Sequence, residues 1–277
     1  MKKYLNPINY LIYFYKKIQL LRFIYIDKKI YSKKFITKNL KKIHDIDSLI
    51  NFHFDKYVKY ELVGITKRIY KINTFSKLII FNSNPFNDVN NPNKAMFKLA
   101  LEQFNLKPLN ILETGSLAHG TKSSILFILY VKIFGGSFTT VDINPEIKKK
   151  YSYLEDINIK FHSGDSVEFI QSLKNDEISQ FDFIYLDSFD LDFSNPHPSQ
   201  EHTFKEFNLL KDNLKKDTLI LIDDTPNRFS KFNITTDNPN NFIPGKGRTI
   251  LSYLKENQSN FSILHHDYSV LLKKINN

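Results

Sequence analysis

Acidic residues close two of the apolar runs in this chain. Asp187 ends the run FDFIYLD, and Asp223 and Asp224 end the run TLILIDD. Such runs are typical of buried strands in a parallel sheet, and open α/β sheets bind ligands at the carboxyl edge of their strands. Three carboxylates at one edge also suit a hard divalent cation, which prefers oxygen ligands. The pattern therefore predicts a binding site, and it is consistent with a metal ion there.

Glycines and further acids follow three other apolar runs. The first run ends in ETGSLAHGT (residues 113–121), with Gly115 and Gly120 in the turn, while Asp142 ends the second and Asp165 follows the third. Glycine lets backbone approach a ligand closely, and a carboxylate accepts two hydrogen bonds from a diol. Asp142 alone fits several ribose-bearing cofactors. The lack of a tight G-x-G-x-x-G run weakens a nicotinamide interpretation.

Strands and helices alternate through the second part of the chain. This alternation predicts a parallel sheet with right-handed crossovers. The last two strands are too close in sequence for a helical crossover, so they should form an antiparallel hairpin. We therefore predict an α/β, Rossmann-like, seven-stranded mixed sheet with helices on both faces. The expected strands are 111–114, 138–142, 157–162, 181–187, 218–223, 261–266 and 269–274, and the expected helices are 94–104, 123–134, one from Pro145, 167–173, 199–214 and 249–256.

Positive charge is concentrated in the first 80 residues. The net charge is +10, but residues 1–80 hold 18 basic and 5 acidic residues, which leaves −3 for the remainder. We expect a basic, mostly helical N-terminal extension over residues 1–93, in which 82–93 form a linker or ordered loop, and a second domain over 94–277. The extension has four open roles: contact with an anionic membrane surface, a lid, a homodimer contact or a solvated helical surface.

The chain contains no cysteine, which excludes disulfides, thiolate zinc sites and cysteine nucleophiles. The apolar stretch Ile8–Ile26 is interrupted by Lys16, Lys17 and Arg22, so we expect no membrane span. A signal peptide is not expected, because the apolar stretch is not followed by a small-residue cleavage site. We expect a cytoplasmic protein, with a helix lying on a membrane surface as the alternative.

Residues 94–277 resemble the class I S-adenosylmethionine-dependent methyltransferases. The resemblance begins at Glu113–Ser116, ETGS, which matches the acidic-x-glycine turn after the first strand of that fold. It implies that this turn wraps the methionine part of S-adenosylmethionine, that Asp142 binds the ribose and that Asp165 binds the adenine. Residues 117–119 depart from the usual glycine spacing, so the turn should differ in shape. The implied cofactor-binding residues are Glu113, Gly115, Ser116, Gly120, Thr121, Asp142, Asp165 and Ser166.

A narrower resemblance is to metal-dependent O-methyltransferases of the catechol, macrocin and aminocoumarin types. The sugar enzymes carry an Asp after strand four and an Asp-Asp pair after strand five, as this chain does. The resemblance implies a magnesium ion held by Asp187, Asp223 and Asp224, which binds and activates the acceptor hydroxyl. Asp190 and His202 are candidate general bases. The expected catalytic residues are Asp187, Asp190 and His202.

Each of these positions also has a purely structural interpretation. Gly115 can serve as a turn glycine, Asp165 as a helix N-cap, Asp224 as a turn cap and His202 as a packing residue. The segment 244–248, PGKGR, fits equally a mobile loop that contacts anions above the acceptor and the beginning of the next helix.

We therefore predict metal-assisted O-methylation of a small molecule or saccharide. One alternative is a cofactor-binding or interaction module without turnover, motivated by the unusual glycine turn. Another is a nucleic-acid methyltransferase, motivated by the basic residues 1–80. The slightly acidic remainder and the lack of an Asn/Asp-Pro-Pro-aromatic tetrapeptide argue against nucleic acid as acceptor. An NAD-dependent oxidoreductase ranks last.

Overall fold

The computed structural model describes residues 40, 42–54, 92–116, 122–192, 195–227, 245–257 and 260–276. The chain divides into two compact units, Met1–His44 and Asp45–Asn277. Most of residues 1–93 lie outside the described part, and so do Gly120 and Thr121, so the expected extension and its boundary at residue 93 stay predictions. No described helix has the length and apolar character needed to cross a membrane.

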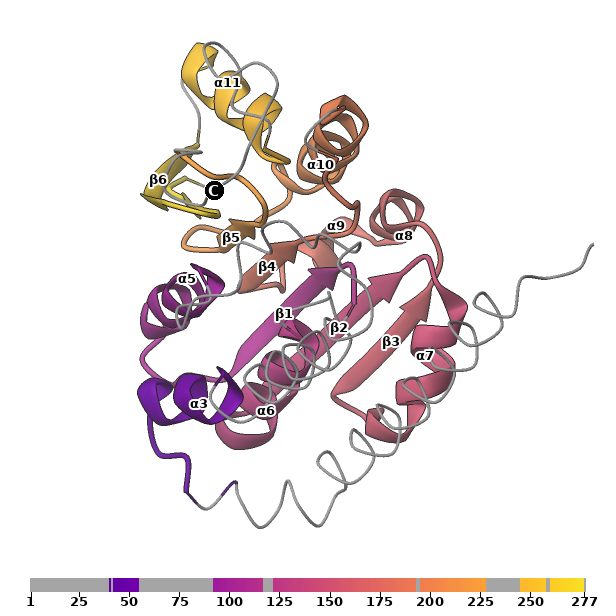
Figure 1. The fold of residues 1–277 in the computed structure, drawn as a ribbon, viewed down its shortest axis with the longest axis vertical. Helices are drawn as coiled ribbons and strands as arrows, with labels where there is room; N and C mark the ends of the chain where they lie inside the picture. The colour runs from indigo at the N-terminus through magenta and orange to yellow at the C-terminus, as the bar shows by residue number, and fades with distance from the viewer. Residues whose placement is uncertain are drawn as a thin grey trace, which may run out of the picture. The chain divides into compact units, whose positions relative to one another are not determined.

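A seven-stranded sheet forms the centre of the second unit (Figure 1). Its order is β3-β2-β1-β4-β5-β7-β6. The first five strands run parallel, and β7 is antiparallel to both β5 and β6. The predicted mixed sheet with a closing hairpin is thus confirmed. The strands are β1 (Leu109–Thr114), β2 (Gly136–Asp142), β3 (Ile159–Ser163), β4 (Phe183–Leu186), β5 (Leu219–Ile222), β6 (Phe261–His266) and β7 (Val270–Lys274).

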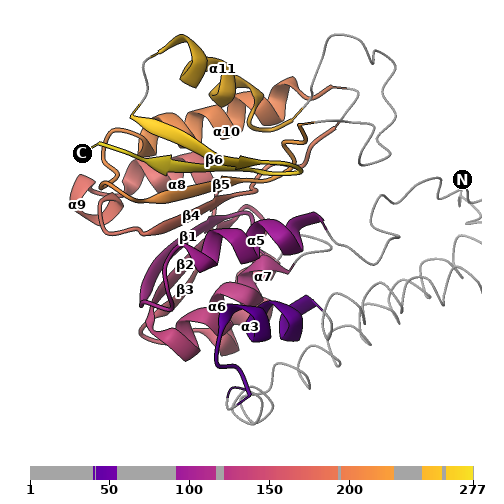
Figure 2. The same cartoon turned by 90° about the vertical axis from the view of Figure 1, so that its left-hand side faces the viewer.

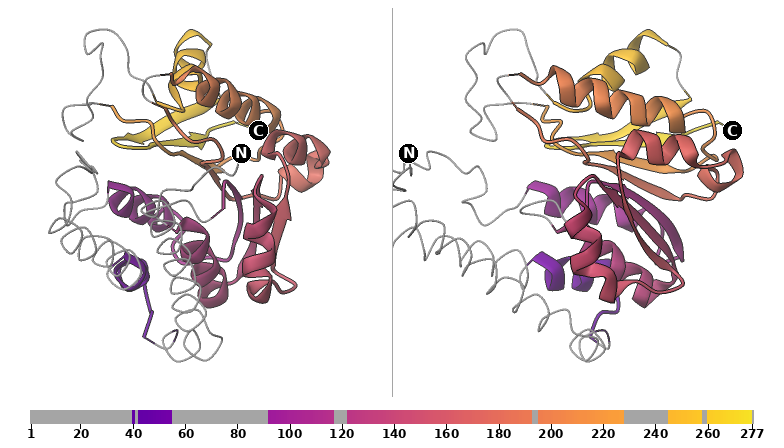
Figure 3. Two further views of the ribbon diagram at one scale, coloured as in Figure 1. Left: turned by 45° about the vertical axis from the view of Figure 1, so that its right-hand side comes forward. Right: turned by 90° about the vertical axis from the view of Figure 1, so that its right-hand side faces the viewer.

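Helices cover both faces of this sheet, as Figures 2 and 3 show. On one face lie α3 (Ile46–His53), α5 (Pro92–Glu102), α6 (Ser123–Phe134) and α7 (Pro145–Tyr151), and on the other lie α8 (Ser166–Ser172), α10 (His197–Leu210) and α11 (Arg248–Glu256). The short helices η3 (Ser152–Leu154) and α9 (Asn175–Ile178) were not expected, and the expected helix 94–104 begins earlier, at Pro92.

The side chains of β4 show why this strand is apolar throughout. Phe183 and Tyr185 point to one face, where each ring lies within 5.9 Å of the Phe127 ring on α6. Ile184 and Leu186 point to the other face and belong to the same core cluster as Phe207 of α10. Successive side chains of a strand alternate between faces, and both faces are covered here, so every residue of β4 presents an aromatic or aliphatic group to the interior.

The strand order places a topological switch point between β1 and β4. The chain runs from β1 outward through β2 to β3, then returns to β4 on the opposite side of β1. The crossovers therefore leave in opposite directions at the carboxyl ends of β1 and β4. Open α/β sheets bind their ligands in the crevice that this reversal creates. The Gly115 turn follows β1 and Asp187 follows β4, so both lie at this point.

Candidate active site

Gly115 brings the turn after β1 against the end of β4. Its φ is +82°, and its backbone N–H donates to the carbonyl of Val141 at 2.9 Å. A Cβ at this position would lie 2.2 Å from the carbonyl oxygen of Asp187 and 2.8 Å from the Cα of Ser188. Both the left-handed conformation and the close backbone contact require glycine. Gly115 therefore joins the two sides of the switch point, and its turn role is confirmed.

Two buried hydroxyl groups lie beside this contact. Thr114 Oγ1 at the end of β1 and Ser188 Oγ after β4 have no hydrogen-bond partner among the described residues. A buried hydroxyl without a partner costs about 1–3 kcal/mol, so native proteins rarely leave one unpaired. Both groups lie at the carboxyl edge of the sheet, Thr114 beside Gly115 and Ser188 beside Asp187.

Asp142 connects the end of β2 to the Gly115 turn. Its carboxylate accepts a hydrogen bond from the backbone N–H of Ser116 at 2.9 Å and from that of Asn144 at 2.7 Å. Burial raises the pKa of Asp142, while the two backbone donors oppose this change and the charge of Asp190 adds to it. Asp190 is exposed.

Asp165 and Ser166 begin α8 on the far side of β2. Asp165 Oδ1 accepts from the backbone N–H groups of Val167 at 2.8 Å and Glu168 at 3.1 Å, so the N-cap interpretation is confirmed. Ser166 Oγ lies 2.9 Å from Nε2 of His202 on α10. The expected cofactor residue Ser166 and the expected base His202 are thus direct neighbours.

His202 is held between Ser166 and a buried carboxylate. Its Nε2 lies 3.6 Å from Glu206, whose side chain is fully buried, and its ring lies 5.4 Å from that of Phe189. The neighbouring Glu206 carboxylate raises the pKa of His202, while burial opposes this change. The imidazole is therefore stabilised in its charged form, so at a given pH a smaller fraction of it is in the neutral form that can accept a proton.

Glu113 faces the protein interior rather than the crevice. Its carboxylate accepts hydrogen bonds from Ser123 Oγ at 2.5 Å, Thr140 Oγ1 at 2.8 Å and Ser124 Oγ, and its side chain is fully buried. Desolvation raises its pKa to about 7, although the three hydroxyl donors oppose this change. Glu113 fixes the first turn of α6 against β1 and β2, so it supports the cofactor turn from behind.

The three predicted metal ligands come together. Asp187, Asp223 and Asp224 each place one carboxylate oxygen within 4.8 Å of the others. Burial is the main cause that raises the pKa of Asp187 and of Asp223, and repulsion between the carboxylates adds to it. The strands β4 and β5 are adjacent and in register, so their ends deliver these residues to one place.

Lys246 is the site residue that sequence reasoning missed. Only 1% of it is exposed, and its Nζ lies 2.5 Å from Asp187 Oδ1 and 3.2 Å from Asp224 Oδ2. Of the two interpretations of segment 244–248, the beginning of a helix is correct, because α11 starts at Arg248. A loop that contacts anions above the acceptor stays a prediction, and in the structure the lysine contacts carboxylates of its own chain. The signal that could have found it is the need of three adjacent acids for a counter-charge.

Two glycines let the segment that carries Lys246 lie flat on the turn after β5. The Lys246 N–H donates to the Asp224 carbonyl at 3.0 Å, and the Gly247 N–H donates to Thr225 Oγ1 at 2.9 Å. A Cβ at Gly245 would lie 2.8 Å from the Thr225 Cα, and one at Gly247 would lie 2.9 Å from Thr225 Oγ1. Larger residues would lift the segment and withdraw the ammonium.

The donor set of the acid cluster fits a divalent cation. Every carboxylate oxygen contacts at least one protein donor within 3.4 Å, and a carboxylate oxygen can accept more than one contact. Three carboxylates and one ammonium carry a formal charge of −2, and a divalent ion would neutralise it. The donors are Lys246 and Tyr185 to Asp187, Ser269 and Asn93 to Asp223, and Tyr268 and Lys246 to Asp224.

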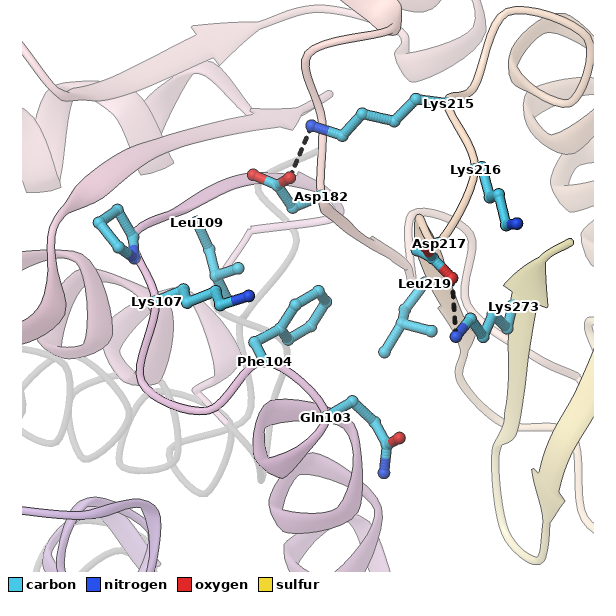
Figure 4. A pocket seen from close by; sticks show the side chains of 11 residues that line it. Gln103, Phe104, Lys107, Leu109, Asp182, Lys215, Lys216, Asp217, Leu219 and Lys273 are labelled. Atoms are coloured by element: carbon cyan, nitrogen blue, oxygen red, sulfur yellow. Dashed lines mark ion pairs between the residues drawn. The ribbon is translucent and has the colours of Figure 1, made fainter. Parts of the chain in front are cut away.

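A separate pocket of about 360 Å³ opens at the opposite, amino edge of the sheet (Figure 4). It is lined by Leu109 and Leu219, the first residues of β1 and β5, and by two ion pairs, Lys215–Asp182 at 2.6 Å and Lys273–Asp217 at 2.8 Å. These pairs are partly exposed, and each charge in them has its partner. The unpaired hydroxyls and buried acids lie at the carboxyl edge, so we place the candidate site there.

No protein-family model matches this chain, and no curated protein matches it. The solved structures with a similar chain trace include the MycE methyltransferase of the mycinamycin pathway in complex with Mg and SAH. Its TM-score is 0.48, with 16% identity over 78% of this chain and 53% of that chain. The present chain thus spans about half the length of MycE.

Two smaller proteins show similar values. An O-methyltransferase from Bacillus cereus in complex with SAH has a TM-score of 0.45 and 14% identity, over 83% of this chain and 100% of that one. The O-methyltransferase NovP has a TM-score of 0.40 and 13% identity, over 62% and 74%. At such identities the likeness is one of fold, so the function depends on the site residues themselves.

Proposed function

We propose that this chain is an S-adenosylmethionine-dependent methyltransferase that methylates a hydroxyl group of a small molecule or saccharide with the help of a divalent cation. The observation that supports this most directly is the contact between Gly115 and the backbone of Asp187. It places a cofactor-type turn directly beside a cluster of three acids. A methyl donor in the turn and an acceptor at the acids would then be neighbours.

The cofactor would lie along the carboxyl ends of β1, β2 and β3. Gly115 and Ser116 would receive its methionine part, Asp142 its ribose and Asp165 with Ser166 its adenine. Thr114 and Ser188 supply two further hydroxyls that lack partners among the described residues. Because the methyl group passes directly from sulfur to oxygen, the task of these residues is to align donor and acceptor.

Asp187, Asp223 and Asp224 would hold the cation. When bound, magnesium supplies Lewis-acid chemistry that polarises the acceptor oxygen and lowers the pKa of its hydroxyl group. Asp190 and His202 remain the proposed general bases. Their placement differs, because Asp190 is exposed whereas His202 is paired with Ser166 and Glu206. A pH profile of Asp190→Asn and His202→Gln would identify the base, because only the loss of the true base removes the profile's acidic limb.

The direct test is transfer of a labelled methyl group to a panel of polyhydroxylated acceptors, with cofactor binding followed by calorimetry. Asp187→Ala should abolish transfer while largely retaining cofactor binding, and a chelator should do the same to the unaltered protein. Asp182→Ala is the matched control, because Asp182 precedes the same strand at the opposite edge. Unchanged turnover after both Asp187→Ala and chelation would exclude the metal.

Cofactor binding without methyl loss across the panel would instead favour the binding module. The observation that favours it is the buried Lys246, which already neutralises part of the acid cluster. The mass of the ligand that co-purifies with the protein distinguishes an S-adenosylmethionine-binding protein, whether methyltransferase or binding module, from an enzyme that binds a nicotinamide cofactor.

The basic residues 1–80 carry a separate proposal, contact with an anionic membrane surface or a second copy of the chain. Co-sedimentation with phosphatidylserine vesicles at low and high salt tests the first, because surface charge attraction is screened by salt. The mass of the protein in solution tests the second.

A further inference from the structure

The acid cluster contains its own cation. Lys246 Nζ contacts Asp187 and Asp224, and its side chain is 2% exposed. Lys246 is therefore a buried residue of the cluster and not a surface lysine in transient contact with the acids. An ammonium group this deeply buried is stable only if nearby carboxylates compensate for its desolvation.

The position of this lysine is built by the backbone rather than by a chance rotamer. Gly245 and Gly247 pack against Thr225, and Thr225 Oγ1 in turn donates to the carbonyl of Asp223 at 2.8 Å. The Lys246 N–H donates to the carbonyl of Asp224. The segment is thus hydrogen-bonded to the same turn that supplies two of the acids.

The ammonium and a metal ion would both lie against the carboxylates of Asp187 and Asp224. The ligand atoms of the cluster lie within 4.8 Å of one another, and Nζ is 2.5 Å from one carboxylate oxygen of Asp187. A cation among the three acids would therefore lie only a few ångströms from Nζ. Like charges at such separations in a buried site repel strongly.

We propose that Lys246 is a tethered counter-ion that competes with the divalent cation for the acid cluster. Without metal, the lysine holds Asp187 and Asp224 together. Metal binding displaces the ammonium from Asp187, so the lysine sets how tightly the site binds metal. This inference rests on the metal site of the proposed function.

The test compares Mn²⁺ and Mg²⁺ binding by calorimetry in the unaltered protein and in Lys246→Met. Removing the competing charge should tighten metal binding by about tenfold or more. Lys246→Gln, which keeps a polar group but not the charge, should behave alike and serves if Lys246→Met does not fold. Lys274→Met is the matched control. Lys274 is also buried, but it lies at the end of β7 away from the acid cluster and donates to the carbonyl of Lys211. Its metal affinity should be unchanged.

A second readout reports displacement directly. Amine-reactive labelling followed by mass spectrometry should find Lys246 protected in the metal-free protein and labelled several-fold faster with saturating Mn²⁺. Equal protection in both states would overturn the proposal, and so would unchanged or weaker metal affinity in Lys246→Met and Lys246→Gln.

The outcomes also separate this inference from the proposed function. If metal binds and supports methyl transfer but the Lys246 variants bind it no more tightly, only the inference fails. If no variant binds metal and chelation leaves transfer intact, both the inference and the metal part of the function fail, whereas cofactor-dependent transfer stands.

Discussion

The two sides of the crevice use their acids in different ways. On the cofactor side, Asp142 and Asp165 accept hydrogen bonds from backbone N–H groups, each including one from two residues further along the chain. On the other side, Asp187 meets Lys246 from 59 residues away, and Asp223 meets Asn93 from 130 residues away. The first side combines local turns with the contact between Asp142 and Ser116, whereas the acids of the other side are held by side chains that only the fold brings together.

This difference has an energetic consequence. A carboxylate that caps a turn keeps its charge near solvent and typically contributes about 1 kcal/mol. Buried carboxylates that repel one another depend on a specific counter-charge, and removal of that partner leaves uncompensated charge in the interior. We therefore expect substitutions in the acid cluster to cost far more stability than substitutions among the cofactor-side acids.

The largest effect should follow Lys246→Met, which leaves three buried carboxylates without their cation. We expect the free energy of unfolding, measured by urea denaturation without metal, to fall by about 3–5 kcal/mol. Added Mn²⁺ should restore part of the lost free energy of unfolding, because the metal ion binds the folded state alone. The control Lys273→Met breaks a partly exposed pair with Asp217 and should cost less than about 1 kcal/mol. Equal losses in the two variants would contradict the comparison.

Glu113 provides a pH-dependent test on the cofactor side. Burial raises its folded pKa from 4.5 to about 7, so between these values the folded state binds the proton more strongly than the unfolded state. Stability from this group is therefore highest below about pH 4.5 and falls, by roughly 3 kcal/mol, as pH rises to about 7. Denaturation of Glu113→Gln across this range should lack that decline. A slope identical to that of the unaltered protein would show that Glu113 does not titrate there.

Gly115 links the two sides, so its substitution should affect both. Gly115→Ala forces a Cβ into the Asp187 carbonyl and should destabilise the protein by about 2–3 kcal/mol. Cofactor affinity should fall with it. Gly164 is the control, because its φ is also positive but a Cβ there meets nothing within 4 Å. If Gly164→Ala lowers the melting temperature as much, the contact with Asp187 is not what Gly115 provides.

The smallest effect should come from Asp165→Ala, which removes an N-cap from α8. We expect a loss of about 1 kcal/mol in stability and a weaker binding of the cofactor. Asp165→Asn should restore the stability, because an amide oxygen also caps helices, but should restore cofactor affinity only in part. A loss as large as that of Lys246→Met would remove the distinction between the two sides.

The sequence predicted most of the sheet because its strands are defined locally. β4 and β5 are continuous apolar runs that end in acids, and the short spacing before β7 excludes a helical crossover. The same local logic identified Gly115, Asp142 and Asp165. The three-acid cluster was also predictable, because parallel strands carry their carboxyl ends to one edge.

The sequence by itself determined which residues end the strands, and with them the acids and the glycine turn, since strand and turn patterns extend over only a few residues. It did not determine how those acids are neutralised. Only the tertiary structure decided that Lys246 is buried between Asp187 and Asp224, that Glu113 faces inward, and that His202 pairs with Ser166. The physical reason is that the burial and electrostatic environment of a charge depend on residues distant in the chain, which local patterns do not encode.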